Sequence, residues 1–306
     1  MGTPEFAVPS LEALVDSGFK PIAVVTGPDK AKGRGQKWSA TAVKNAAISL
    51  GIEHILTPED VKSESFAEAI RELQPDIMVV VAFRILPESV FSAAKRGTFN
   101  LHGSLLPKYR GAAPINRAIM AGETETGVTT FLLQQKVDTG NILIKRAMSI
   151  GEHETAGEVH DRMSVLGAGV VVETVRLIES GDYTAVSQDD SLASPAPKIF
   201  RQDCEIDWAR PSGEVHNQIR GLSPYPGAFT SLDGKTMKVY ASLPKPKTNT
   251  SARAGEVLEN EHSILVSCGS GSLEILTVQL EGKKAMSSSE FLRGNSIHVG
   301  TQLGNV

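Results

Sequence analysis

The stretch DIMVVVAF, residues 76–83, decides the fold of this chain of 306 residues. It is an unbroken apolar run that is rich in β-branched side chains, and it is too short to span a membrane. Runs of this kind are typical of a strand whose two faces are both covered. We therefore expect a sheet with helices packed on both of its faces.

The segments around residues 76–83 alternate between extended and helical patterns. Ser63 is placed to cap one of the expected helices, whose apolar residues recur on a single face. This alternation predicts an α/β fold with a Rossmann-like, mostly parallel sheet. The expected strands are residues 22–25, 52–56, 76–83, 98–102, 127–133 and 142–150, and the expected helices are residues 11–16, 42–50, 63–73, 115–120 and 155–180.

Residues 182–198 differ from what precedes them, because they are polar and rich in Ser, Asp, Ala and Pro. Beyond them the pattern predicts a helix at 214–222 and then five short strands separated by turn residues. That succession is typical of a small β-barrel, and we expect one of oligonucleotide-binding (OB-like) type. The chain is thus predicted to hold an α/β domain at 1–181, a linker at 182–198 and a barrel domain at 199–306.

Composition excludes several classes of protein. The net charge of −4 gives no overall positive field for nucleic acid, although residues 28–38, PDKAKGRGQKW, form a local basic patch. Two cysteines, Cys204 and Cys268, make no disulfide framework, and the seven histidines do not pair at zinc-site spacings. We expect no metal site, no membrane span and no export signal.

The stretch TFNLH, residues 98–102, places two polar side chains on one face of a strand. Because side chains alternate, Asn100 and His102 point together while Phe99 and Leu101 point the other way. Ligands bind at the carboxyl ends of strands in open α/β sheets, and an amide beside an imidazole suits a carbonyl oxygen that gains negative charge. For an isolated Asn-x-His pair, a turn-capping Asn and a core His are the more common interpretation.

A carboxylate follows in a second apolar region. Asp138, in VDTG at residues 137–140, lies in a turn between two expected strands, where it can pair with His102. Plain turn chemistry is one alternative for this Asp. The Asp-Thr-Gly of aspartic proteases is another, but it requires a second copy of the motif and all-β lobes, which this sequence lacks.

The motifs together resemble those of the methionyl-tRNA formyltransferases, a family within the folate-dependent formyltransferase superfamily. The resemblance runs from GTPEFAVPSL near the start, through NLHGSLLPKYRGAAPI at residues 100–115 and VDTG, to EIDW, SPYPGAF and EGKKAM at residues 281–286. It implies transfer of the formyl group of 10-formyltetrahydrofolate to the α-amino group of methionyl initiator tRNA, the reaction that prepares this tRNA for translation initiation.

The resemblance also assigns roles to residues. Asn100, His102 and Asp138 match the family's catalytic trio. The folate would lie against a set of six residues from two loops, and the tRNA against a basic loop and a C-terminal turn. The implied folate residues are Phe83, Leu86, Ser104, Leu105, Leu106 and Pro107, and the implied tRNA residues are Lys30, Lys32, Arg34, Lys37, Lys283 and Lys284. By the same resemblance we expect a cytoplasmic, monomeric enzyme with a catalytic domain at 1–181 and no metal.

This chain departs from the family pattern at two places. The family has an apolar strand before GTPEF, whereas Met1 and Gly2 already lie in the turn that follows it. We therefore expect the sheet to lack an inner strand, with apolar faces and unpaired backbone exposed on its neighbours, and we interpret Met1 as a misplaced start. In the donor-side loop, Phe83 and Arg84 stand where many members have Tyr-Gly.

Two other functions fit parts of the pattern. A glycinamide-ribonucleotide or sugar-amine formyltransferase would share the catalytic trio, but the domain after residue 198, the basic loop and EGKKAM favour tRNA as the acceptor. A nucleotide- or tRNA-binding module without catalysis would have no use for the trio, and the chain has no Gly-x-Gly-x-x-Gly after a strand. Wide separation of the three side chains would favour that module.

Overall fold

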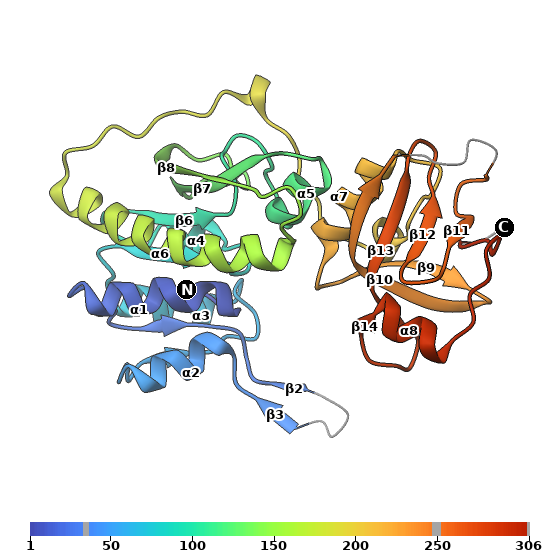
Figure 1. Cartoon of the computed structure of the whole chain (residues 1–306). Coiled ribbons are helices and arrows are strands. Elements are labelled where there is room, and N and C mark those ends of the chain that lie inside the picture. Colours follow the sequence, from blue (N-terminus) through green and yellow to red (C-terminus); the bar gives the residue numbers. More distant parts are fainter. Residues whose placement is uncertain (33–36, 247–251, 305–306) are drawn as a thin grey trace. The chain divides into compact units, whose positions relative to one another are not determined.

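A computed structural model describes residues 1–32, 37–246 and 252–304. The chain folds into two compact units (Figure 1). The N-terminal unit comprises Met1–Pro114, Thr126–Met148 and His160–Ala196. The C-terminal unit comprises Ile115–Glu125, Ser149–Val159 and Pro197–Val306. Two short segments from the middle of the chain therefore belong with the C-terminal third.

The first 196 residues alternate between helices and strands, as the sequence predicts. Thr41 and Ser63 cap two of the helices by accepting hydrogen bonds from backbone N–H groups of the first turn. The elements are η1 (Glu5–Ala7), α1 (Val8–Asp16), β1 (Val24–Val25), β2 (Lys30–Lys32), β3 (Lys37–Ser39), α2 (Ala42–Ser49), β4 (Ile55–Leu56), α3 (Glu64–Glu72), β5 (Met78–Val81), α4 (Glu88–Phe91), β6 (Thr98–His102), α5 (Pro114–Met120), β7 (Glu125–Leu132), β8 (Ile142–Ser149), α6 (Ala156–Ser180) and η2 (Asp190–Leu192).

The strands of the N-terminal unit form a mixed arrangement. β5, β6, β7 and β8 make one sheet in that order, and β1 pairs with β4 in a separate parallel pair. β5 and β6 are parallel, as β1 and β4 are, whereas β7 joins β6 antiparallel, so the predicted parallel pairing is present and is extended by an antiparallel strand. Sequence patterns report burial, and a covered strand is apolar whichever way its neighbour runs.

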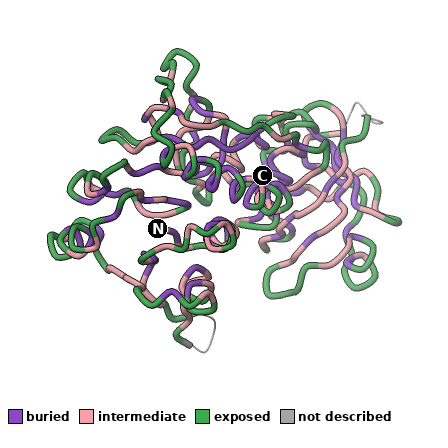
Figure 2. Tube along the Cα trace, turned by 90° about the vertical axis from the view of Figure 1, so that its left-hand side faces the viewer, coloured by how far each residue is buried: buried purple, intermediate pink, exposed green. Residues whose placement is uncertain are grey.

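Helices cover both faces of the four-stranded sheet. Met78 and Val80 of β5 pack in a core cluster with residues of α3 and α4. On the opposite face, Leu101 lies so close to Gly167 of α6 that a Cβ there would stand 2.6 Å from a Leu101 methyl carbon. Buried residues accordingly follow the strands and the inward sides of the helices (Figure 2).

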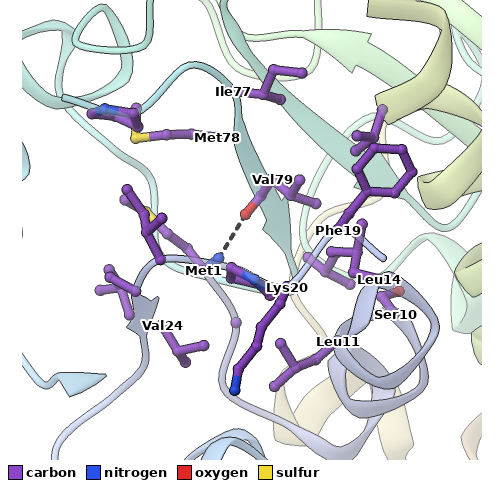
Figure 3. A pocket seen from close by; sticks show the side chains of 18 of the residues that line it. Met1, Ser10, Leu11, Leu14, Phe19, Lys20, Val24, Ile77, Met78 and Val79 are labelled. Carbon is purple, nitrogen blue, oxygen red and sulfur yellow. Dashed lines mark hydrogen bonds between the residues drawn. The ribbon is translucent and has the colours of Figure 1, made fainter. Parts of the chain in front are cut away.

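Met1 lies between Val24 of β1 and Val79 of β5 (Figure 3), and Gly2 bridges the same two strands. The Gly2 N–H donates to Val25 O at 3.0 Å, the Val81 N–H donates to Met1 O at 2.9 Å, and the Met1 amine donates to Val79 O at 2.6 Å. Burial lowers the pKa of this amine to about 5.

Beyond these two residues, the described chain places no strand between β1 and β5. A cavity of about 430 Å³ lies there instead, lined mainly by apolar side chains that include Leu11, Leu14, Phe19 and Val24. The expected gap in the sheet is therefore present, with apolar neighbours facing it.

The C-terminal unit is built around a curled antiparallel sheet. Its strands run in the order β11-β12-β13-β10-β9, and β14 pairs with β13. Trp208, Ile219, Met237 and Val266 are among the residues of its core. The sheet carries the expected antiparallel strands. The elements are η3 (Arg201–Cys204), α7 (Ser212–Leu222), β9 (Ala228–Leu232), β10 (Lys235–Lys245), β11 (Val257–Glu259), β12 (Ile264–Ser267), β13 (Ser272–Leu280), β14 (Met286–Ser287) and α8 (Ser288–Gly294).

Candidate active site

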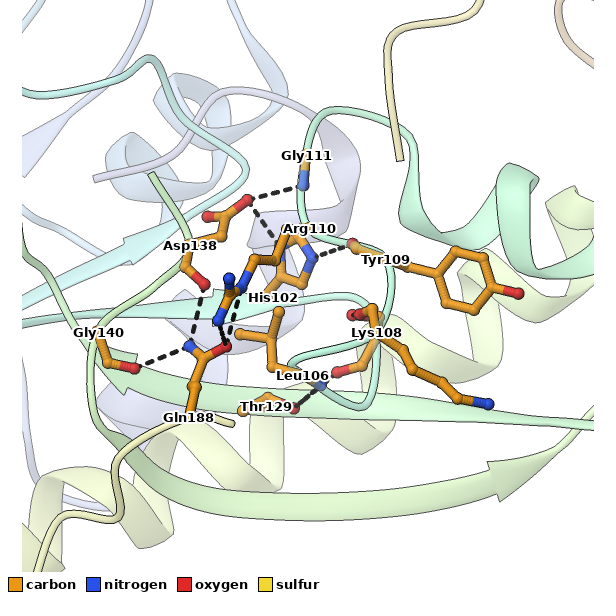
Figure 4. Close-up of polar contacts among 11 residues, drawn as sticks. His102, Leu106, Lys108, Tyr109, Arg110, Gly111, Thr129, Asp138, Gly140 and Gln188 are labelled. Carbon is orange, nitrogen blue, oxygen red and sulfur yellow. Dashed lines mark hydrogen bonds and ion pairs between the residues drawn. The ribbon is translucent and has the colours of Figure 1, made fainter. Parts of the chain in front are cut away.

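His102 and Asp138 come together beside the end of β6 (Figure 4). The His102 Nδ1 lies 3.8 Å from the Asp138 Oδ2, and the two side chains are only 7% and 13% exposed. They belong to one strand end and one turn that are 36 positions apart in the sequence. The pairing that the motifs predict is therefore present in the fold.

The other ring nitrogen of His102 has a defined role. Its Nε2 lies 2.8 Å from the backbone carbonyl oxygen of Tyr109. Because a carbonyl only accepts, Nε2 must carry the hydrogen. The Nδ1–Oδ2 distance exceeds hydrogen-bond length, so Nδ1 is left as the ring nitrogen that can engage a further group.

Asp138 is held in a tight turn. Its φ of +55° is in the left-handed region, which Asp tolerates better than most residues. Its Oδ2 accepts a hydrogen bond of 2.9 Å from the Gly111 N–H. The carboxylate thereby links the turn at 137–140 to the loop after β6.

Asn100 lies on the same face of β6 as His102. It is half-buried, and its register partners are Val80 of β5 and Phe131 of β7. No side-chain hydrogen bond of Asn100 is found within residues 1–32, 37–246 and 252–304. Its amide N–H donors are therefore available to a ligand.

The side chain of Thr129 on β7 holds the loop at residues 103–113 by two hydrogen bonds. The Thr129 hydroxyl donates to Ser104 O at 2.7 Å and accepts from the Leu106 N–H at 3.1 Å. Ser104, Leu106 and Pro107 are buried, and the Ser104 hydroxyl donates to Lys108 O. A ligand can therefore meet these three residues chiefly through the backbone.

The remaining implied folate residues differ in exposure. Leu86 is a core residue at 7% exposure. Phe83 and Leu105 are half-buried, and the Arg84 guanidinium lies 5.3 Å from the Phe83 ring centroid. The apolar side chains of Phe83 and Leu105 are therefore partly accessible, whereas that of Leu86 is not.

Residues 182–196 contribute to the site, which sequence patterns did not indicate. The Gln188 side chain contacts Asp138, Gly140 and Arg110, and Arg110 also pairs with Asp190. The Arg110 guanidinium holds the pKa of the Asp190 carboxyl below its ordinary value. A polar stretch of Ser, Asp and Gln carries no local signal of these contacts, because they depend on partners about 50 to 80 positions away.

The basic residues implied for tRNA lie on two hairpins. Lys30 is exposed on β2, which pairs with β3, and Lys32 and Lys37 are the paired residues at the end of that hairpin. Arg34 lies outside the described residues. Lys283 and Lys284 are exposed in the turn between β13 and β14.

The described part of the chain holds no cluster of three His, Cys, Asp or Glu side chains that could bind a metal ion. Within the same ranges, no helix is both long and apolar enough to cross a bilayer. Cys204 and Cys268 are buried, and neither forms a disulfide.

This fold and site define a formyl-transferring enzyme. Residues 1–175 match the family model described as formyl transferase, and residues 198–296 match that of the formyl transferase C-terminal domain. An N-formyltransferase from Helicobacter canadensis, solved in complex with folinic acid and dTDP-3-aminofucose, superposes with a TM-score of 0.67 at 24% identity, covering 90% of this chain and 96% of its own.

Full-length relatives narrow the class further. The methionyl-tRNA formyltransferase of Chlorobium luteolum is 49% identical over 96% of this chain and 95% of its own length. That of Geobacter sulfurreducens is 47% identical over 99% of this chain and 95% of its own length. The chain belongs to the methionyl-tRNA formyltransferase family.

Proposed function

We propose that this protein transfers the formyl group of 10-formyltetrahydrofolate to the α-amino group of methionyl initiator tRNA, giving N-formylmethionyl-tRNA for translation initiation. One observation carries the proposal: the His102–Asp138 pair stands beside an unpaired Asn100 amide in a chain of this family. An amide, an imidazole and a carboxylate are the groups that acyl transfer to an amine requires.

Asn100 and His102 act on the formyl oxygen. Since Nε2 of His102 donates to Tyr109 O, Nδ1 can donate only in the imidazolium form, which carries a hydrogen on both nitrogens. We assign that form to this step, in which Asn100 donates from its amide. These hydrogens stabilise the negative charge that develops on the oxygen as the amine attacks. Each such donor raises kcat by a factor of about 10²–10³.

Asp138 acts on the proton. Its Oδ2 is 3.8 Å from Nδ1, so the formyl oxygen can contact Nδ1 while the amine on the same carbon contacts Oδ2. The carboxylate takes up the proton that the amine loses, directly or through water, and returns it to the folate nitrogen as the carbon–nitrogen bond there breaks. Little base strength is needed, because an α-amine has a pKa near ~8.

The folate donor supplies an activated formyl group, and it enters as a co-substrate. Phe83 and Leu105 provide apolar surface for its ring system, and Ser104, Leu106 and Pro107 shape the loop beside it. Leu86 anchors the loop that carries Phe83 in the core. No metal takes part in this proposal.

The acceptor tRNA is bound by basic residues of both units. The loop at residues 30–37, with Lys30, Lys32, Arg34 and Lys37, contacts the acceptor end, and Lys283 and Lys284 contact the phosphate backbone. The C-terminal sheet serves as an OB-like, tRNA-binding module at 199–306, and residues 1–181 form the catalytic domain. The enzyme acts as a monomer in the cytoplasm, where initiator tRNA is charged.

Formyl transfer from 10-formyltetrahydrofolate to methionyl initiator tRNA tests the function. We expect transfer by the wild type and a loss of about 10²–10³ in kcat for Asn100→Ala and for His102→Ala. Circular dichroism shows whether each variant is folded. A folded wild type that formylates a dTDP-amino sugar and leaves the charged tRNA unmodified would refute the proposed acceptor, and full activity of both variants would refute the proposed site.

A further inference from the structure

The Gln188 side chain ties together two loops that carry the site (Figure 4). Its Nε2 donates to Asp138 O at 2.9 Å and to Gly140 O at 2.8 Å. Its Oε1 accepts from the Arg110 Nε at 3.0 Å and from the Arg110 Nη2 at 2.7 Å. Carbonyls only accept and a guanidinium only donates, so a single orientation of the amide satisfies all four bonds.

The segment that carries Gln188 is anchored on both sides of it. Before Gln188, Val186 and Ile142 exchange two backbone hydrogen bonds of 2.8 Å. After it, Arg110 and Tyr109 donate backbone N–H groups to Ser194, and Ala196 donates to Arg110 O. Gln188 is half-buried, whereas its two chain neighbours are exposed, so its side chain is turned toward the site.

We propose that Gln188 is a positioning residue for Asp138. The amide holds the turn at 138–140 by its carbonyl oxygens, and this turn places the Asp138 carboxylate 3.8 Å from His102 Nδ1 and 2.9 Å from the Gly111 nitrogen. Asp138 has a positive φ, a conformation that needs support from its surroundings. The four hydrogen bonds engage both amide hydrogens and the amide oxygen of Gln188 within the protein, so we assign this side chain no contact with the substrate.

Arg110 completes the arrangement from the other loop. Its guanidinium is 14% exposed, and it spans Gln188 Oε1 and Asp190 Oδ1. Because Gly111, the next residue, donates to Asp138, the amide of Gln188 fixes both the carboxylate and one of its hydrogen-bond donors. The proposal rests on the proposed role of Asp138 in formyl transfer, and it adds the group that sets the geometry of that carboxylate.

A double-mutant cycle tests the proposal in the full-length enzyme. Gln188→Met keeps the volume and removes all four hydrogen bonds, and Gln135→Met, at an exposed glutamine just before the same turn, is the matched control. We expect Gln188→Met to lower kcat about 10–100-fold with little change in either KM, and Gln135→Met to leave kcat unchanged. In an Asp138→Asn background, Gln188→Met should cost less than about 3-fold.

Gln188→Glu separates the two halves of the amide. It retains an acceptor for Arg110 but loses the donors to Asp138 O and Gly140 O. Loss of kcat as large as in Gln188→Met supports positioning through the turn. Equal costs of Gln188→Met in the wild-type and Asp138→Asn backgrounds would overturn the proposal, because they show a role independent of Asp138.

Amide hydrogen exchange at Gly111 gives a readout that needs no substrate. Its N–H is held by Asp138 Oδ2, so we expect faster exchange in Gln188→Met and wild-type exchange in Gln135→Met. Unchanged exchange in Gln188→Met would overturn the proposal. If the wild type formylates no charged tRNA, the proposed function fails, and the exchange measurement still decides whether Gln188 positions Asp138.

Discussion

At the scale of single residues, alternation along β6 sets the chemistry of the site. Phe99 and Leu101 are buried at 0% and 3% exposure on one face, and Asn100 and His102 share the other. A shift of one position in this strand would exchange the two pairs, placing polar groups against α6 and apolar ones at the site. The apolar pair therefore fixes the orientation of the polar pair.

His216 makes the stability of the folded protein depend on pH. His216 of α7 is buried, its Nδ1 lies 3.0 Å from the Ser242 hydroxyl, and its Nε2 lies 3.1 Å from His153 Nδ1. Burial, and then the nearby charges of Arg220 and His153, lower the pKa of His216 from 6.5 to about 4, against the opposing effect of Glu152. The folded protein therefore keeps this ring neutral where the unfolded chain would protonate it.

The lowered pKa of His216 makes the protein less stable in acid. Between pH 6.5 and 4 the unfolded chain binds a proton that the folded state does not, so stability falls as the pH is lowered through this window. We expect this residue alone to account for about 1–2 kcal/mol of lost unfolding free energy at pH 5. Urea denaturation of the wild type and of His216→Gln at pH 7 and pH 5 measures it. Equal pH dependence in the two proteins would contradict the assignment.

At the scale of elements, α6 packs through a glycine. Gly167 is buried against Leu101 of β6, whereas Gly169, half a turn away on the same helix, is exposed and has no atom near the position of a Cβ. The two glycines share backbone conformation and sequence context. Substitutions at the two positions therefore distinguish the effect of packing from that of helix propensity.

We expect opposite effects from alanine at these two positions. Gly167→Ala puts a methyl group 2.6 Å from a Leu101 methyl carbon and should destabilise the protein by about 1–3 kcal/mol. Gly169→Ala should stabilise it by about 0.5–1 kcal/mol, because alanine loses less backbone entropy in a helix. Urea denaturation followed by circular dichroism measures both. A stabilising Gly167→Ala would show that α6 does not need this close approach.

At the scale of the whole molecule, charge location matters more than net charge. The chain is acidic overall at −4, yet its proposed tRNA contacts are lysines and one arginine, concentrated in residues 30–37 and 283–284. Each phosphate contact releases bound counterions, so affinity depends on salt in proportion to the number of contacts.

The lysine pair at 283–284 gives a test. Lys283→Ala/Lys284→Ala should weaken tRNA binding and reduce the slope of log Kd against log salt concentration by about 1–2. The control Lys62→Ala/Lys145→Ala removes two exposed lysines and gives the same net charge. Equal salt slopes for the two double variants would show that Lys283 and Lys284 contact no phosphate and contribute only to the overall electrostatic potential of the protein.

The sequence by itself determined the order of the elements and the strand that carries the site. The bounds of β6 match residues 98–102, and Asn100 and His102 share a face as alternation requires. Local periodicity, capping residues and turn signals act over a few positions, so the sequence displays them directly. The catalytic roles of Asn100, His102 and Asp138 and the gap between β1 and β5 were implied instead by the resemblance, since no local rule brings Asp138 to His102.

Only the tertiary structure decided what meets across long stretches of chain. It made β7 antiparallel to β6, grouped residues 115–125 and 149–159 with the C-terminal unit, and returned residues 182–196, expected as a linker, to the loops beside His102. It also brought Gln188 to Asp138, 50 positions away in the sequence. Such contacts are selected by packing and hydrogen-bond satisfaction over the whole unit, and for that reason no segment of the sequence shows them alone.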